Sequence, residues 1–354
     1  MYKVDNSIIN WLLEDENPPV KYLTLTKLLD EKEDSSIIQE TIQKINTYKP
    51  IADIFAKQKE NSYWFDKKKN QNYKKYLGTY WQLLFLYEMH AQKNKRITNA
   101  IEHIFSTGQA PNGGFLVSGT NSLVAECLTA NMLRVLIHYD YLDDDRTHNA
   151  LEFLLNWFVD RNGKIRCQTI GLLKNCYMVM PKILFALSMI PEKKRNPRVT
   201  KGINLCVERL LDNQIYKYLP EKNNEYLKYI REKKLTSQQR REEKKRMLKE
   251  NPDMAKVAKT GWTEFSFPHS YTSDALDAMR SLVSAKVKYS NQMSDALELI
   301  KNNAVNGAWI NKIKTRSPMH TQIEEVNQKS KWLTFHALSV LKFYEKLEIN
   351  ENIS

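Results

Sequence analysis

Three cysteines and one histidine have the residue types of a tetrahedral zinc site: Cys127, Cys167, Cys176 and His269. Zinc binds thiolate sulfur and imidazole nitrogen, and catalytic zinc sites keep one position open for water or substrate. An open position would suit activation of a thiol, a water or a carbonyl group. No CxxC pair is present, so the spacing alone is not diagnostic, and burial as small core residues is the alternative. Zinc is the one cofactor that the sequence suggests.

Two carboxylates are candidates for acid–base catalysis, Asp274 and Glu126. Asp274 and Asp277 are three residues apart on a segment with helical periodicity, so they share one face of that helix. Burial there would raise the pKa of a carboxyl group toward the range that is useful for proton transfer. An ordinary salt bridge or a stabilising acid at the start of a helix is the alternative.

Five aromatic residues are candidates for a ligand-binding wall: Tyr80, Trp81, Tyr177, Tyr271 and Trp332. Aromatic walls suit an isoprenoid or another apolar ligand, and they stabilise a carbocation through cation–π contact. Packing between neighbouring helices is the alternative, because large aromatic side chains also dominate ordinary cores.

The chain that must position these residues is expected to be all-α. It has 354 residues, of which 42% are hydrophobic and only 10 are glycine, and it lacks alternating β-branched runs bounded by turns. Six strongly apolar segments recur, mostly at a period of about 50 to 60 residues. They begin near Tyr22, Tyr80, Leu128, Tyr177, Tyr271 and Trp332. Six amphipathic segments lie between them, at residues 6–14, 36–47, 96–106, 145–158, 197–212 and 292–302.

Alternating apolar and amphipathic helices favour an (α/α)6 toroid. The apolar helices would form an inner ring and the amphipathic helices an outer ring, in a single domain of residues 1–354; an open helical solenoid is the alternative. The inner helices would all point the same way, so their N-terminal ends would meet at one mouth of a central cavity. Helix N-termini favour an anion or a thiolate. The candidate metal, carboxylate and aromatic residues would gather at this mouth.

The ordered set of segments resembles the prenyltransferase-like and squalene-cyclase-like repeat proteins of the terpenoid cyclase and protein prenyltransferase superfamily. The resemblance covers nearly the whole chain outside residues 216–260. It is carried by residues 11–29 (WLLEDENPPVKYLTLTKLL), 109–115 (QAPNGGF), 127–146 (CLTANMLRVLIHYDYLDDDR), 175–180 (NCYMVM), 262–268 (WTEFSFP) and 330–344 (SKWLTFHALSVLKFY).

The resemblance implies an α/α toroid with a central cavity for an apolar or isoprenoid-like ligand, as in a transferase or a cyclase-like enzyme. The protein prenyltransferases place zinc at a comparable mouth. The chain departs from its relatives at Ala130, where they tend to have glycine, and at Tyr177 and Val179 in the NCYMVM segment. The D-x-D-D motif of the protonating cyclases is absent; residues 143–145 are three successive aspartates that we expect to cap a helix.

The basic charge is concentrated in an expected helical insertion at residues 216–260. The chain has a net charge of +13, and the stretch from Lys217 to Lys259 has 14 Lys or Arg against 7 Asp or Glu. Nucleic acid or an anionic membrane surface is a possible partner for such a segment. A solvated arm or a lid is the alternative. A non-catalytic scaffold that holds an acidic partner on the barrel surface and this arm is the rival to ligand binding in the cavity.

The expected location is cytoplasmic. The N-terminal residues are amphipathic and acidic toward their end, unlike a signal peptide, and four cysteines without such a signal suggest a reducing compartment. The most apolar window is interrupted by Pro181 and Lys182, so no transmembrane segment is expected.

Overall fold

The computed structural model describes residues 1–65, 72–117, 123–165, 176–218, 257–259, 261–269, 272–313 and 317–349, with a few residues between 235 and 246. These residues are mostly helical, which confirms the prediction of a mainly α-helical protein. None of the helices in this described part is long and apolar enough to cross a membrane. Two candidate residues, Cys167 and Tyr271, lie outside the described ranges.

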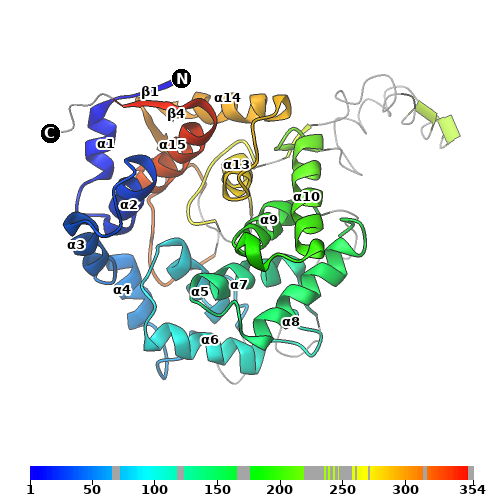
Figure 1. Cartoon of the computed structure of the whole chain (residues 1–354), viewed down its shortest axis with the longest axis horizontal. Coiled ribbons are helices and arrows are strands. Elements are labelled where there is room, and N and C mark those ends of the chain that lie inside the picture. Colours follow the sequence, from blue (N-terminus) through cyan, green and yellow to red (C-terminus); the bar gives the residue numbers. More distant parts are fainter. Residues whose placement is uncertain are drawn as a thin grey trace.

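The apolar segments form the helices in the middle of Figure 1. They are α2 (Pro18–Leu23) with the π-helical turn Thr24–Leu28, α5 (Thr79–Glu88), α7 (Glu126–His138), α9 (Met180–Ser188), α13 (Ala275–Ser284) and α15 (Lys331–Glu345). Nearly all residues of α5 and α9 and most residues of α13 are buried, because neighbours cover these helices on most sides. Helices α5, α7, α9, α13 and α15 form a row in sequence order in which each contacts the next, and the last of them, α15, contacts α2, the first inner helix of the chain.

The amphipathic segments form helices at the periphery in Figure 1. They are α1 (Asn6–Leu12), α3 (Ser36–Ile45), α4 (Lys49–Ala56), α6 (Lys95–Gly108), α8 (Asp145–Leu154), α10 (Pro197–Asp212) and α14 (Ser294–Asn302). Each buries one stripe, as α6 does with Ile97, Ala100, Ile101 and Ile104. Asp144 caps α8 by accepting a hydrogen bond from the Arg146 N–H at 2.8 Å, as expected for the aspartate cluster.

A threonine hydroxyl ties three of the inner helices to the turn that precedes them. Thr79, Thr129 and Thr334 are all fully buried near the start of α5, α7 and α15. Each Oγ1 accepts a hydrogen bond from the backbone N–H of a buried aromatic residue in the turn: Trp64 at 3.3 Å, Phe115 at 3.0 Å and Trp309 at 3.0 Å. A threonine at the start of an inner helix and a buried aromatic residue in the preceding turn therefore form the same contact in three places.

Short strands join segments that are distant in the sequence. The N-terminal strand β1 (Tyr2–Val4) pairs in parallel with the C-terminal strand β7 (Leu347–Ile349), with Tyr2 opposite Leu347. The strands β4 (Ala304–Val305), β5 (Ala308–Ile310) and β6 (Lys329–Ser330) form a small antiparallel sheet. The pair β2 (Lys217–Tyr218) and β3 (Val257–Ala258) brings together the two ends of the predicted insertion, most of which lies outside the described residues.

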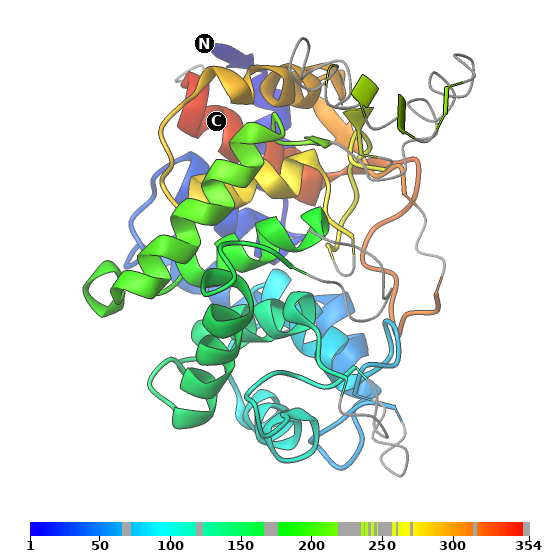
Figure 2. The same ribbon diagram turned by 90° about the vertical axis from the view of Figure 1, so that its right-hand side faces the viewer.

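The inner helices run in the same general direction. Figure 2 shows the loops that lead into α13 and α15 on one side of the molecule and the turns that follow α7 and α9 on the opposite side. One hydrophobic cluster extends through these helices from Val4 to Leu341. The N-terminal ends of the inner helices therefore lie at one end of the molecule, and their C-terminal ends lie at the other.

Candidate functional site

The first group of candidate residues lies where the inner helices α7, α9 and α13 begin. Cys127 is the second residue of α7, and Cys176 directly precedes the 3-10 turn (Tyr177–Val179) that leads into α9. Both thiols interact electrostatically with Lys182 of α9. Lys182 is only 3% exposed, and its ammonium donates a hydrogen bond to Ser273 Oγ at 2.6 Å, just before α13. Burial lowers the pKa of Lys182, and the carboxylate of Asp277 opposes that effect.

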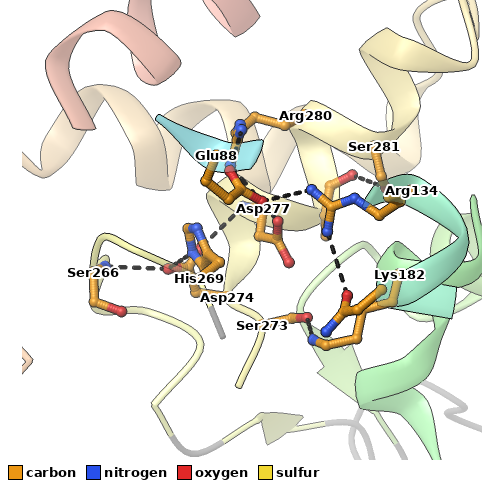
Figure 3. Close-up of polar contacts among 12 residues, drawn as sticks. Glu88, Arg134, Lys182, Ser266, His269, Ser273, Asp274, Asp277, Arg280 and Ser281 are labelled. Atoms are coloured by element: carbon orange, nitrogen blue, oxygen red, sulfur yellow. Dashed lines mark hydrogen bonds and ion pairs between the residues drawn. The ribbon is translucent and has the colours of Figure 1, made fainter. Parts of the chain in front are cut away.

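His269 and Asp274 form a buried pair at this same end (Figure 3). His269 Nε2 lies 2.7 Å from Asp274 Oδ2, and both side chains are almost completely inaccessible. Asp274 also caps α13, since its Oδ1 accepts a hydrogen bond from the Asp277 N–H at 2.8 Å. Burial alone would lower the pKa of His269, but the carboxylates of Asp274 and Asp277 outweigh it and raise that pKa. The pair can hold a proton, so it has acid–base capacity, although the capping contact also gives Asp274 a structural role.

The other carboxylate candidate, Glu126, is the first residue of α7 and is 3% exposed. Its place in the first turn suits a negative charge, because the N-terminal end of a helix is positive. The structure therefore places Glu126 and Asp274 at the starts of two different inner helices, as expected.

The described residues do not by themselves make up a zinc site. Among them, no three His, Cys, Asp or Glu side chains converge in a way that could hold a metal ion. The Lys182 ammonium beside Cys127 and Cys176 would also repel a divalent cation. Because Cys167 lies outside the described ranges, the four-residue zinc set stays a prediction. Cys206 is completely buried in α10, and burial raises the pKa of its thiol.

The four described aromatic candidates pack between elements of the fold. The hydroxyl of Tyr80 donates to the Gly108 carbonyl at 3.1 Å, the indole of Trp81 donates to the Tyr73 carbonyl at 2.9 Å, and Trp332 stacks on Phe267 at 4.3 Å between ring centroids. Tyr177 donates to a carbonyl of the segment after α10. None of these four lines the large cavity described next, and Tyr271 lies outside the described residues.

A cavity of about 890 Å³ lies at the opposite end, where the inner helices finish. All six inner helices or the turns that follow them contribute to it. Its apolar and aromatic lining includes Leu23, Tyr87, Phe185, Met189, Val283, Phe335, Val340 and Phe343. Its polar lining includes Lys27, Asp30, Glu88, His90, His138, Ser284, Arg280, His336, Ser339 and Lys342. A cavity whose wall combines apolar side chains with convergent polar groups is typical of a small-molecule site.

Two residues of the polar lining, Glu88 and Arg280, belong to a buried ion cluster (Figure 3). Glu88 of α5 and Arg134 of α7 make a 2.6 Å ion pair with side chains that are 2% and 3% exposed. Arg280 of α13 lies 3.5 Å from Glu88 and 3.8 Å from Asp277. Burial would raise the pKa of Asp277, but nearby cations, His269 first and then Lys182, hold it at about 2. The ion cluster therefore connects electrostatically to the His269 end of the molecule.

Three histidines of the lining are neutral near pH 7. Burial lowers the pKa of His90 to about 3, with a further contribution from His138, and burial also lowers the pKa of His138. The pKa of His336 is lowered well below its usual value by burial and then by the charge of Arg280. Neutral imidazoles can each donate one hydrogen bond and accept one, which suits a polar group on a ligand.

The polar residues at this end of the molecule are not among those predicted from the sequence. The signal was present as charged residues inside otherwise apolar helices, namely Glu88 in residues 79–88, Arg134 in residues 126–138 and Arg280 in residues 275–284. Lys, Glu and Arg are almost never fully buried unless they are paired, so each such residue predicts a partner on a neighbouring helix.

No protein-family model matches the chain, and no curated protein matches its sequence.

Proposed function

We propose that the chain binds an apolar or isoprenoid-like ligand in the cavity at the C-terminal ends of its inner helices, within a closed (α/α)6 toroid like that of the terpenoid cyclases and protein prenyltransferases. The observation that carries the proposal is the cavity itself. Its volume of about 890 Å³ lies in the usual range for small-molecule sites, and apolar side chains of α2, α5, α9, α13 and α15 line it, with His138 from α7.

The arrangement of helices supports the toroid. Buried helices in the middle alternate along the chain with half-buried helices at the periphery (Figure 1), and the β1–β7 pair holds the two ends of the described chain together. A ring of helix pairs explains both features, because closing a ring requires the first and last pairs to be neighbours.

A catalytic version of this proposal uses the residues at the opposite end of the inner helices. His269 with Asp274 would hold or move a proton, and Glu126 would be a second candidate for acid–base catalysis. Zinc would be held by Cys127, Cys167, Cys176 and His269. Elemental analysis of protein purified without a chelator tests the zinc set. About one zinc per chain, lost in a Cys127→Ser variant, supports it, and metal-free protein with unreactive thiols contradicts it.

Filling the cavity tests the ligand-binding proposal. Val283 and Ser339 lie on its lining from α13 and α15, and replacing each with Trp puts two large rings into the space where the ligand would lie. We expect wild-type protein to bind a fluorescent apolar probe that farnesol displaces, and the Val283→Trp/Ser339→Trp variant to lose this binding. Val305→Trp is the matched control, because Val305 is 43% exposed and lies outside the cavity lining. Equal binding in all three proteins would refute the proposal.

The concentrated basic charge supports a second candidate, in which the segment 217–259 holds an acidic partner such as nucleic acid or an anionic membrane surface. Replacing Arg240, Arg241, Lys244 and Lys245 with Glu should abolish retention on an anionic resin and on RNA or anionic vesicles. Unchanged binding to these polyanions would refute this candidate, and ligand binding in the cavity would be unaffected.

A further inference from the structure

Arg280 is an incompletely used guanidinium on the wall of the cavity. Its two carboxylate neighbours, Glu88 and Asp277, lie at 3.5 Å and 3.8 Å, which is longer than the 2.7–2.9 Å typical of charge-assisted hydrogen bonds. Its Nη1 is buried and makes no hydrogen bond. Arg134 differs, because it contacts Glu88 at 2.6 Å and so takes the best acceptor in the cluster. Arg280 therefore has capacity for another acceptor.

His336 is a second buried polar group on the same wall. It comes from α15, is 5% exposed and lines the cavity, and its Nε2 is buried without a hydrogen-bond partner. Among the charges that act on His336, that of Arg280 lowers its pKa the most. Buried polar groups are normally satisfied, and two buried atoms without a hydrogen bond, on residues that line one cavity from different helices, point to an acceptor that binds there.

We infer that the ligand of this cavity carries a single carboxylate, which Arg280 binds through its planar fork while His336 donates a further hydrogen bond. The inference rests on the proposed ligand-binding function and names the class of ligand: a long apolar carboxylic acid. A carboxylate matches the guanidinium fork in shape, and the apolar remainder would lie against Phe185, Phe335 and Val283.

The surroundings of Arg280 disfavour a phosphate or diphosphate. The inner helices finish at this end, and the C-terminal end of a helix carries a partial negative charge. Glu88 and Asp277 add two carboxylates beside Arg280. Lys342 is already engaged with the Leu28 carbonyl and with Asp30. Arg134 is already paired with Glu88, and Lys27 is the remaining cation among the described residues of the lining. The helix ends, Glu88 and Asp277 would therefore oppose a group with two or three negative charges more strongly than a group with one.

A matched ligand series tests the inference on the full-length protein. Farnesoic acid, farnesol and farnesyl monophosphate share one apolar chain and differ in the head group, and calorimetry measures the Kd of each. We expect the acid to bind more tightly than the alcohol by about tenfold or more, from charge-assisted hydrogen bonds. We also expect the acid to bind more tightly than the monophosphate. An alcohol or a monophosphate that binds as tightly as the acid would overturn the inference.

Variants assign the preference to the two residues. Arg280→Gln should weaken binding of the acid to the affinity of the alcohol and leave the affinity for the alcohol unchanged. Arg280→Lys should keep part of the preference for the acid over the alcohol. His336→Phe should reduce that preference several-fold. Arg161→Gln is the control for the loss of one positive charge, because Arg161 is exposed and stacks on Trp157 at 4.0 Å, away from the cavity. A preference for the acid that persists in both Arg280→Gln and His336→Phe would overturn the inference.

The two proposals fail in different ways. If the alcohol binds and the acid gains nothing, the carboxylate inference is wrong and ligand binding stands. If none of the three ligands binds to wild-type protein, the proposed function is wrong, and the inference that rests on it is wrong too.

Discussion

Removing Arg134 should destabilise the protein more than any exposed substitution, because it leaves a buried carboxylate without its main partner. Arg134 and Glu88 form a 2.6 Å ion pair with side chains 3% and 2% exposed. Breaking a buried pair by removing one partner costs about 3–5 kcal/mol. In Arg134→Met, Glu88 keeps only the 3.5 Å contact with Arg280, and Phe185 loses a cation that now lies 4.5 Å from its ring. We expect Arg134→Met to lower the free energy of unfolding by about 3 kcal/mol, because Arg280 can move closer to Glu88 and compensate in part.

Urea unfolding of four proteins measures this cost: wild type, Arg134→Met, Glu88→Gln and the double variant. The double variant leaves no buried charge behind, so it should be more stable than Arg134→Met alone, with a coupling energy of about 1–3 kcal/mol. Arg198→Met is the control. Its ion pair with Glu152 is also 2.6 Å long, but the side chains are 36% and 48% exposed, so the cost should be at most about 1 kcal/mol.

Equal costs for Arg134→Met and Arg198→Met would refute this reasoning. That result would mean that water or another cation replaces Arg134 beside Glu88. The polar wall of the cavity would then lack the pre-organised ion cluster on which the expected preference for a carboxylate depends.

Three further outcomes follow from the structure. Thr129→Val should lower the free energy of unfolding in urea by about 1–3 kcal/mol, because the buried Phe115 N–H loses its acceptor. Thr129→Ser should keep most of the stability. Equal losses in the two variants would show that the hydroxyl contact contributes nothing. Burial raises the pKa of Glu324 from 4.5 to about 7, so the folded state binds more protons than the unfolded state in that range and loses stability as pH rises through it. Glu324→Gln should therefore raise Tm relative to wild type above about pH 7 and not below about pH 4, and a pH-independent difference would contradict this. The depressed pKa of His90 means that stability is lost as pH falls from 6.5 to about 3, and His90→Asn should reduce that loss in an acid titration followed by circular dichroism.

Much of the helical framework could be predicted from the sequence, because periodicity and caps are local. The helix expected at residues 197–212 is observed as α10 with the same bounds, starting after Asn196, whose side chain caps it. One helix was predicted at residues 36–47, but the structure has two helices in this region. The first ends at Ile45, and α4 follows with Pro50 in its first turn. Proline favours such a helix start, but the alternating pattern did not indicate it.

The site was harder to predict because it depends on which helices become neighbours. The gathering of Cys127, Cys176 and Asp274 at helix starts followed from the shared direction of the inner helices. The pairing of Glu88 with Arg134 joins residues on different helices, and no local pattern fixes it. The large cavity lies at helix ends because side chains such as Trp332 and Phe267 stack and occupy the space at the other end.

Photocrosslinking tests the central claim most directly. Wild-type protein would be irradiated with an apolar isoprenoid analogue that carries a diazirine, with and without excess farnesol, and the labelled peptides identified by mass spectrometry. The proposed function predicts that farnesol-protected label lies on the cavity lining, in α9, α13 and α15 near Phe185, Val283 and Phe335. Label that farnesol does not displace, or that lies on the outer helices α6, α8 and α10, would contradict it.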